Sequence, residues 1–262
     1  MGKKIYLTII WLITLFCILV GCNRYVSSFP WSFWGEESYE EVEDFDTSTK
    51  RTTKDNGEKG THKYEQAFTN LIISCDTADI TIKDGDEFSC KYKVPSESEY
   101  SLEWKPDNEG TAYITQTNDK VINVKGASFV ITIPSHVTLS SVSVENAVGD
   151  TKINGITVNE LSVTCDVGDF EMKKSVAGNM TVDTHTGDVE FKHTEFANLT
   201  ARCDVGDCKV EDIDLNRYNF NLSAGVGEIE INDVKEKSSY VLDNKQSQNI
   251  DIVCNVGEVE IN

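Results

Sequence analysis

Cysteine is the residue type whose number and spacing in this chain first raise the question of a chemical role, namely the formation of disulfide bonds. The chain contains eight cysteines, of which Cys17 and Cys22 lie in or directly after an apolar N-terminal segment. The remaining six are Cys75, Cys90, Cys165, Cys203, Cys208 and Cys254. An even number of thiols in an exported chain permits disulfide bonds, and Cys203 and Cys208 flank a short turn across which they could pair. The alternative is that all six are small, buried, apolar side chains.

Acidic side chains recur beside glycine and raise the question of a metal site. Gly-Asp or Gly-Glu pairs place acids at Asp150, Asp169, Asp188, Asp207, Glu228 and Glu258, joined by Asp166 and Asp204 two positions before their glycines. Like charges about 5 Å apart repel by roughly 1 kcal/mol in water, so a column of these acids would be stabilised by Ca²⁺. Calcium-binding solenoids, however, use a nonapeptide with further glycines, which is absent. We therefore expect glycine to supply positive φ and aspartate to bond the turn backbone, with no metal or cofactor.

The four histidines do not indicate a catalytic site. They are His62, His136, His185 and His193, and no Ser or Cys motif offers one of them a nucleophile to activate. Some solenoids cleave acidic polysaccharides with an Asp, Arg and Lys groove, but the repeats described below contain only Arg202 and Arg217. We predict that the protein is not an enzyme. A polysaccharide-active enzyme remains the alternative of that class.

Charge and composition exclude several functions. The chain has 262 residues and a formal net charge of −20 at pH 7, which disfavours nucleic-acid binding because phosphates require Lys and Arg. The same charge disfavours a polybasic attachment to anionic lipid. Hydrophobic residues make up 39% of the chain, too many for a disordered protein and too few for an integral membrane bundle.

The first residues have the pattern of an export signal. Lys3 and Lys4 precede an uncharged run, residues 5–20, which as a helix would span about 24 Å and so fall short of a bilayer core. The run ends in Leu-Val-Gly before Cys22 and resembles a bacterial lipobox. Residues 1–21 are therefore predicted to be a lipoprotein signal peptide, with a lipid on Cys22 holding the mature chain to the outer face of the cell membrane. The alternative is an uncleaved anchor in which Cys22 has no role.

Residues 22–65 lack a steady period and are predicted to form a flexible tether. They contain an aromatic group at residues 29–34, an acidic run at residues 36–46 and a polar stretch at residues 47–61. Trp31, Phe33 and Trp34 could rest among lipid headgroups or could cover part of the folded domain.

A repeat of about 19 residues dominates the rest of the chain. Glycines at positions 149, 168, 187, 206, 227 and 257 are spaced by 19, 19, 19, 21 and 30 residues. Apolar residues recur seven before, five before, one before and four after each glycine, with Thr186 the one exception, as in Leu161, Val163, Val167 and Met172 around Gly168. Polar residues alternate with them, which is the period of a β-strand. An earlier segment, residues 71–82, matches the same frame with Ala-Asp in place of Gly-Asp.

Such a repeat predicts an all-β fold, a parallel β-solenoid over residues 66–262. Each coil would stack on the preceding one about 4.8 Å away, with its aliphatic residues filling a continuous interior. A β-propeller blade needs about 40 residues, and the leucine-rich repeat signature is absent. Two coils would separate Cys165 from Cys203 by about 9.6 Å, too far for a disulfide. We expect residues 232–245 to project as a side loop and the last coil, ending at Asn262, to expose its edge.

Residues 86–134 fit the repeat poorly and are predicted to form an irregular N-terminal cap or elaboration. Their alternating segments cover residues 100–104, 112–116, 121–124 and 129–133. A cap is expected because a terminal coil otherwise exposes unpaired backbone groups.

Several segments together are similar to a known family. Residues 129–134, residues 139–144 and recurring units such as residues 163–169 and 182–188 resemble the bacterial putative-adhesin family of β-strand repeats, a domain of unknown function. The resemblance extends over roughly residues 66–262. It implies an envelope-facing β-solenoid associated with adhesion and carries over no catalytic residue.

These features together predict a non-enzymatic surface lipoprotein of the cell envelope. Its acidic β-solenoid would be displayed for adhesion or for contact with an unknown envelope or extracellular partner, and not with nucleic acid. The alternative is a structural or regulatory partner of a membrane signalling complex, contacted through the Trp-rich segment and the terminal coil.

The lipid assignment predicts the behaviour of Cys22→Ala. Without the thiol no lipid can be attached, so the variant should leave the membrane fraction or remain unprocessed, as measured by cell fractionation and by the mass of the mature chain. A variant that matures and partitions like the wild type would refute the assignment.

Overall fold

The computed structural model describes residues 48–52, 57–64, 66–96, 98–105, 110–118 and 126–262, which belong to one unit spanning residues 41–262. The predicted signal peptide (residues 1–21), the predicted lipid site at Cys22 and residues 23–47 of the predicted tether lie outside the described residues. Within the described ranges, no helix is both long enough and apolar enough to cross a bilayer.

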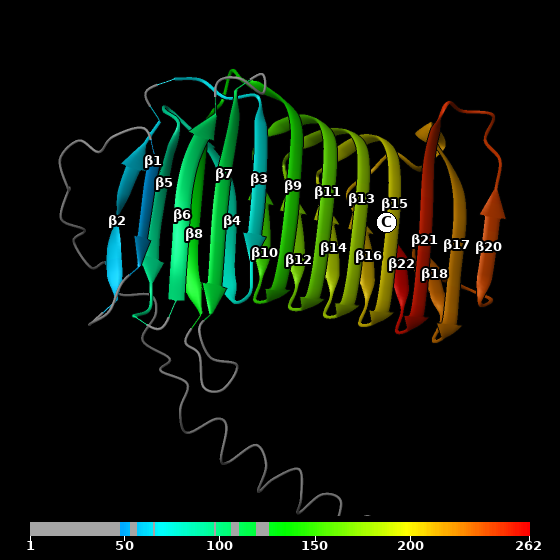
Figure 1. Cartoon of the computed structure of the whole chain (residues 1–262). Coiled ribbons are helices and arrows are strands. Elements are labelled where there is room, and N and C mark those ends of the chain that lie inside the picture. Colours follow the sequence, from blue (N-terminus) through cyan, green and yellow to red (C-terminus); the bar gives the residue numbers. More distant parts are fainter. Residues whose placement is uncertain (1–47, 53–56, 65, 97, 106–109, 119–125) are drawn as a thin grey trace, which may run out of the picture. The chain divides into compact units, whose positions relative to one another are not determined.

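Two mixed β-sheets face each other in the described domain (Figure 1). The first sheet has eleven strands in the spatial order β1 (Ser48–Thr52), β6 (Ser98–Lys105), β7 (Thr111–Asn118), β3 (Asn70–Cys75), β9 (Thr138–Val148), β11 (Thr157–Val167), β13 (Val176–Thr186), β15 (Glu195–Val205), β21 (Gln248–Val256), β17 (Tyr218–Val226) and β20 (Ser239–Leu242). The second has eleven in the order β19 (Val234–Glu236), β18 (Ile229–Ile231), β22 (Val259–Ile261), β16 (Cys208–Glu211), β14 (Val189–Lys192), β12 (Phe170–Lys173), β10 (Thr151–Asn154), β4 (Ala78–Gly85), β8 (Ala127–Pro134), β5 (Ser89–Val94) and β2 (Glu58–Lys63). A short 3-10 helix, η2 (Leu215–Arg217), precedes β17.

Each coil of this β-solenoid-like fold combines a long strand of the first sheet, a turn at glycine and a short strand of the second sheet. Strand β11 pairs in parallel with β9 and β13, so that Val163 lies between Val144 and Val182. The short strands pair in the same register, so that Met172 of β12 lies between Ile153 of β10 and Phe191 of β14. The 19-residue repeat is therefore confirmed, because one step of 19 residues along the chain is one step across both sheets.

The interior lies between the two sheets. Val144, Val163 and Val182, five residues before their glycines, are each no more than 1% exposed. Burying an aliphatic side chain of this size stabilises the fold by roughly 1.5–3 kcal/mol, so each coil depends on its neighbours for much of its stability. Aromatic rings continue the packing, with the ring centroids of Phe196 and Tyr218 lying 5.1 Å apart.

One predicted interior column instead faces solvent. Val148, Val167 and Val205, each one residue before its glycine, are 44–49% exposed. The interior closes before this position, because the buried Cys165 thiol lies 3.7 Å from the buried Thr151 hydroxyl of the opposite sheet. A residue two positions beyond Cys165 therefore has no facing strand to cover it.

The coils do not stack in the order of the sequence. The C-terminal coil, β21 and β22, is inserted between the coil β15–β16 and the coil β17–β18, so that Ile250 lies between Leu199 and Phe220. The prediction that each coil stacks on the preceding one is therefore wrong for the last two coils. The terminal coil is also not an exposed edge, because strands cover it on both sides.

The residues predicted to form a side loop instead finish the stack. Within residues 232–245, β19 pairs antiparallel with β18. Strand β20 pairs antiparallel with β17, beside which it lies in Figure 1. The residues between Gly227 and Gly257 therefore form two edge strands and then return the chain to the position between β15 and β17.

The N-terminal end of the stack is built from mixed pairings. Strands β3 and β4 pair in parallel with β9 and β10, so residues 71–82 form a coil as predicted. The alternating segments 100–104, 112–116 and 129–133 lie within β6, β7 and β8, whereas residues 121–124 lie outside the described residues. Strands β1 and β2 fall inside the predicted tether, which is therefore wrong for those residues: they pair with β6 and β5.

From Gly149 onward, the turn glycines form a column that only glycine can occupy, whereas the first coil has Ala78 at this position. Gly168, Gly187 and Gly206 have φ values of 144°, 141° and 144°, a region that residues with a Cβ atom rarely enter. A Cβ atom on Gly187 would also overlap the carbonyl oxygen of Gly168 in the neighbouring coil. Both backbone conformation and stacking distance therefore require glycine here.

Gly187→Ala should lower the free energy of unfolding by about 2–4 kcal/mol, because strain and steric overlap act together. Chemical denaturation measures the loss. The matched control is Gly126→Ala, since a Cβ atom at Gly126 would make an ordinary 3.6 Å contact with Thr77. Equal stability of the two variants would contradict this account of the glycine column.

Candidate functional site

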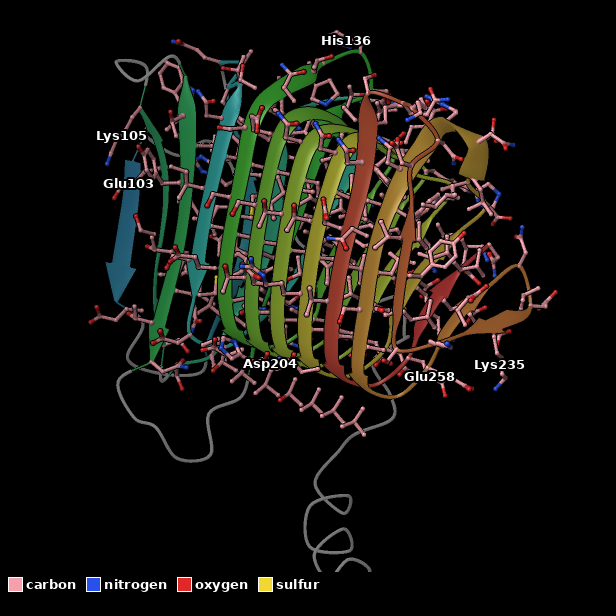
Figure 2. All side chains as sticks on the ribbon, turned by 90° about the vertical axis from the view of Figure 1, so that its right-hand side faces the viewer. Glu103, Lys105, His136, Asp204, Lys235 and Glu258 are labelled. Atoms are coloured by element: carbon pink, nitrogen blue, oxygen red, sulfur yellow. The ribbon has the colours of Figure 1, made fainter. Side chains whose placement is uncertain are left out.

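The glycine turns lie side by side along one edge of the stack, which we call the turn edge. It comprises the residues two before, one before and one after each turn glycine. Asp204 and Glu258 mark it in Figure 2, where both lie along the lower edge of the sheets. Three columns of side chains therefore run parallel along this edge, perpendicular to the strands.

The column after the glycines is a ladder of hydrogen bonds between coils, which we call the aspartate ladder. The amide N–H groups of five acids in this column donate to a carboxylate of the adjacent coil: Asp150 to Asp79 at 3.2 Å, Asp169 to Asp150 at 3.1 Å, Asp188 to Asp169 at 2.9 Å, Asp207 to Asp188 at 2.8 Å and Glu258 to Asp207 at 2.9 Å. The predicted bond from aspartate to turn backbone therefore exists, but it joins neighbouring coils rather than closing one turn.

The negative charge of the aspartate ladder is only partly neutralised. Lys152 Nζ lies 3.9 Å from Asp150 Oδ2 at one end, and Lys235 pairs with Glu228 at the other. Among the described residues, no basic group lies within 4 Å of the carboxylates of the intervening coils, Asp169, Asp188, Asp207 and Glu258. The centre of the turn edge is therefore strongly acidic.

The column two residues before the glycines adds two further acids, Asp166 and Asp204. His185 lies between them, with Nδ1 at 3.4 Å from Asp166 Oδ1 and Nε2 at 3.9 Å from Asp204 Oδ2. Asn255 in the inserted coil donates to Asp204 Oδ1 at 2.7 Å. The side chains of His185, Asp166 and Asp204 are 62%, 60% and 52% exposed, so this column is open to an external partner.

A third column, one residue before the glycines, consists mainly of aliphatic side chains and lies in sequence between Asp166 or Asp204 and the aspartate ladder. We call its aliphatic side chains the valine row; in spatial order they are Val148, Val167, Val205, Val256 and Val226, with Thr186 between the second and third. Their exposed fractions are 44%, 49%, 49%, 45% and 68%. Sequence reasoning assigned them to the interior, because their residue type and alternation match the buried valines.

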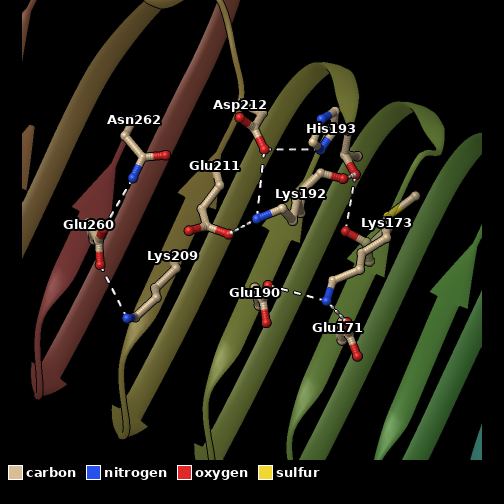
Figure 3. Close-up of polar contacts among 12 residues, drawn as sticks. Glu171, Lys173, Glu190, Lys192, His193, Lys209, Glu211, Asp212, Glu260 and Asn262 are labelled. Carbon is tan, nitrogen blue, oxygen red and sulfur yellow. Dashed lines mark hydrogen bonds and ion pairs between the residues drawn. The ribbon is translucent and has the colours of Figure 1, made fainter. Parts of the chain in front are cut away.

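The outer face of the second sheet has a different charge arrangement. There lysines pair with acids of the same or the next coil (Figure 3): Lys173 with Glu171 and Glu190, Lys192 with Glu211 and Lys209 with Glu260. Such exposed ion pairs add little stability, yet they balance the charge of that face. Excess negative charge beside exposed apolar surface is thus a property of the turn edge.

The thiols occupy the interior behind the turn edge. Cys75, Cys90, Cys165, Cys203, Cys208 and Cys254 are all buried and free in this structure, including the pair Cys203 and Cys208 that could have bridged. Cys203 Sγ donates to the Gly187 carbonyl at 3.3 Å and Cys254 Sγ to the Gly206 carbonyl at 3.1 Å. Burial raises the pKa of Cys203 to about 12, so its reactive thiolate form is disfavoured in the folded domain.

The structure does not bring the histidines together. His185 is on the turn edge, whereas His193 pairs at 3.0 Å with Asp212 on another turn, and His136 lies at the opposite edge in Figure 2. His62 is buried in β2 against Tyr64, and this burial lowers its pKa. In the described part of the chain, no group of three or more His, Cys, Asp or Glu has the arrangement of a metal site.

Comparison with known proteins gives one family match and several solved structures of similar fold. A family model described as Toastrack DUF4097 matches residues 68–255. The structure of a "putative cell adhesion protein" from Clostridium sporogenes is 18% identical with a TM-score of 0.50, over 79% of this chain and 99% of that one. A "putative adhesin" from Bacteroides fragilis is 15% identical with a TM-score of 0.41, over 78% and 97%. No curated protein matches the chain. Identities this low show a shared fold alone.

The aspartate ladder predicts different effects for two substitutions of one residue. Asp188→Ala removes the acceptor of the Asp207 amide and should cost about 0.5–1.5 kcal/mol of unfolding free energy, whereas Asp188→Asn keeps an acceptor and should cost less than about 0.5 kcal/mol. Chemical denaturation with Ca²⁺ and with a chelator should give the same midpoint for the wild type. A chelator-dependent midpoint, or equal losses for the two variants, would count against the ladder.

Proposed function

Because the chain belongs to the Toastrack DUF4097 family, we propose that it is a non-enzymatic envelope lipoprotein that adheres to another protein through the turn edge of its β-solenoid. The observation that carries this proposal is the exposed valine row beside the aspartate ladder on one side and Asp166 and Asp204 on the other. Exposed aliphatic side chains lower the solubility of a protein. Carboxylates without a basic partner lower its stability because they repel one another. A contact surface accounts for both features.

The chemistry of the turn edge specifies the kind of partner. A complementary protein would carry an aliphatic strip flanked by Lys or Arg, because cations opposite these acids attract and position it while the strip excludes water from the valines. Six coils at about 4.8 Å spacing offer a row of about 24 Å, the length of roughly seven residues of extended chain. Association should weaken with salt, since exposed charges are screened over about 8–10 Å.

The proposed location follows from the N-terminal sequence. A lipid on Cys22, after removal of residues 1–21, would hold the domain at the outer face of the cell membrane. A surface role is supported by the solved structure of similar fold that is described as a putative cell adhesion protein. A non-enzymatic role is supported by the separation of His185 and His193 onto different edges.

Site-specific photo-crosslinking in intact cells tests the proposal without knowing the partner. A photoreactive amino acid replacing Val167 in the full chain should give a covalent adduct on illumination. Replacement of Val176 is the matched control, because it is 47% exposed against 49% for Val167 but begins β13 at the far end of the long strands. Combining the Val167 probe with Asp166→Asn and Asp204→Asn should reduce the adduct several-fold, since two attractive charges are lost.

Two results would reject the turn edge as the contact surface. One is equal crosslinking from positions 167 and 176, which would indicate non-specific encounters. The other is the absence of adducts from position 167 and from every other position of the valine row in cells that carry the protein at its native level.

A further inference from the structure

Three thiols meet where the C-terminal coil enters the stack. Cys203 on β15 and Cys254 on β21 are register partners on adjacent parallel strands, and each thiol is close enough to the other to affect its pKa. Cys208 on β16 of the opposite sheet is close enough for both thiols to add to the effect of burial in raising its pKa. All three side chains are no more than 1% exposed.

The insertion of the last coil is what makes Cys203 and Cys254 neighbours. Had the coils stacked in sequence order, the coil containing Ala224 would separate the two cysteines by about 9.6 Å, beyond the range of a disulfide. On adjacent strands the Cα atoms are about 4.8 Å apart, within the 4.4–6.8 Å over which disulfides form. The Cβ atoms start at a similar spacing, so they must approach each other by a few tenths of an ångström to enter the range of about 3.5–4.5 Å that a disulfide requires. Cys165 occupies the same register, but its partners are Asn146 and Thr184, so it has no thiol beside it.

We propose that Cys203 and Cys254 become joined by a disulfide bond that fastens the C-terminal coil into the stack. The bond would enclose residues 204–253, including the terminal coil β17–β18 and the edge strands β19 and β20. This proposal rests on the proposed function in one respect, the location outside the cytoplasm, because disulfides form and persist outside the reducing cytoplasm. The role of the bond is to keep the inserted coil, and hence the valine row at Val205 and Val256, continuous.

The reaction is thiol–disulfide exchange with an external disulfide as oxidant. The Cys254 thiolate attacks one sulfur of the oxidant, forming a mixed disulfide and releasing one thiolate. The Cys203 thiolate then attacks Cys254 Sγ and releases the second. The two protons lost by the cysteines are taken up by the two released thiolates, so the two cysteines are oxidised and one external disulfide is reduced to two thiols.

Burial sets when this exchange can occur. The thiolate of Cys203 is scarce in the folded domain because burial raises its pKa to about 12, and burial raises the pKa of Cys254 as well. Exchange must therefore happen while the C-terminal coil is outside its place, before the thiols are covered. Once the coil is inserted, both the bond and any unreacted thiols are protected.

Peptide mapping of the full chain tests the proposal. The protein is taken from its membrane in detergent, unfolded with an alkylating reagent present from the start, and digested without reductant. We expect a linked peptide pair containing Cys203 and Cys254, whereas Cys165 should be fully alkylated. A second sample, unfolded, reduced and refolded with oxidised glutathione, should form the same link, and it should form far more slowly when oxidised glutathione is added to already folded, reduced protein.

The matched variants are Cys254→Ser and Cys165→Ser. The first keeps a hydrogen-bond donor but should abolish the link, and it should make the C-terminal coil several-fold more sensitive to protease than in the oxidised wild type. The second should leave both unchanged. Because the mapping itself uses the wild-type chain, it does not depend on whether a variant folds.

Three outcomes would overturn the inference. They are free thiols at both positions in cells and after refolding, a link from Cys203 to Cys208 instead, and a link that forms after refolding but never in cells. The last outcome would leave crosslinking at the turn edge unaffected, and crosslinking can fail while the disulfide forms, so the two proposals fail separately.

Discussion

The stacking of coils depends on one close contact, in which each turn glycine packs against the turn carbonyl of the neighbouring coil, which belongs to Ala78 in the first case and to a glycine in the others. Gly187 against Gly168 leaves no room for a Cβ atom, and the φ values near 140° are accessible to little besides glycine. This contact fixes the distance and the register between coils. Every other column, from the buried valines to the aspartate ladder, follows from that register.

In-register stacking gives the same position in every coil the same environment, and this has opposite consequences inside and outside. Inside, Val163 and its equivalents form a continuous core. At the turn edge, like charges and aliphatic side chains accumulate in rows, because neither acids nor valines can avoid their equivalents in the next coil. The aspartate ladder offsets part of the repulsion by bonding each carboxylate to an adjacent amide, as Asp188 does with Asp207.

The coil architecture was predictable because glycine spacing and strand alternation are local signals that agree with each other. The exposure of Val167 was not, since it shares residue type and alternation with the buried Val163, and only the facing strand decides which one is covered. The position of Cys254 could not be predicted either. A 30-residue spacing between Gly227 and Gly257 allows the last coil to lie at the end of the stack or to insert between two earlier coils. Strand β2 lacks a regular apolar alternation, so the sequence suggested a tether where the structure has an edge. The acids were recognised as a column, but the amide each one bonds depends on the neighbouring coil.

Hydrogen exchange measured by mass spectrometry on the full chain tests the inserted stack most directly. Amides of β21 lie between β15 and β17, so they should exchange only at the slow rate of the central strand β13, while β20 at the end of the sheet should exchange quickly. Protection of β21 equal to that of β13 is the expected result. Rapid exchange throughout β21, at the rate of β20, would show that the C-terminal coil is an edge and would contradict the arrangement on which the turn edge and the thiol pair depend.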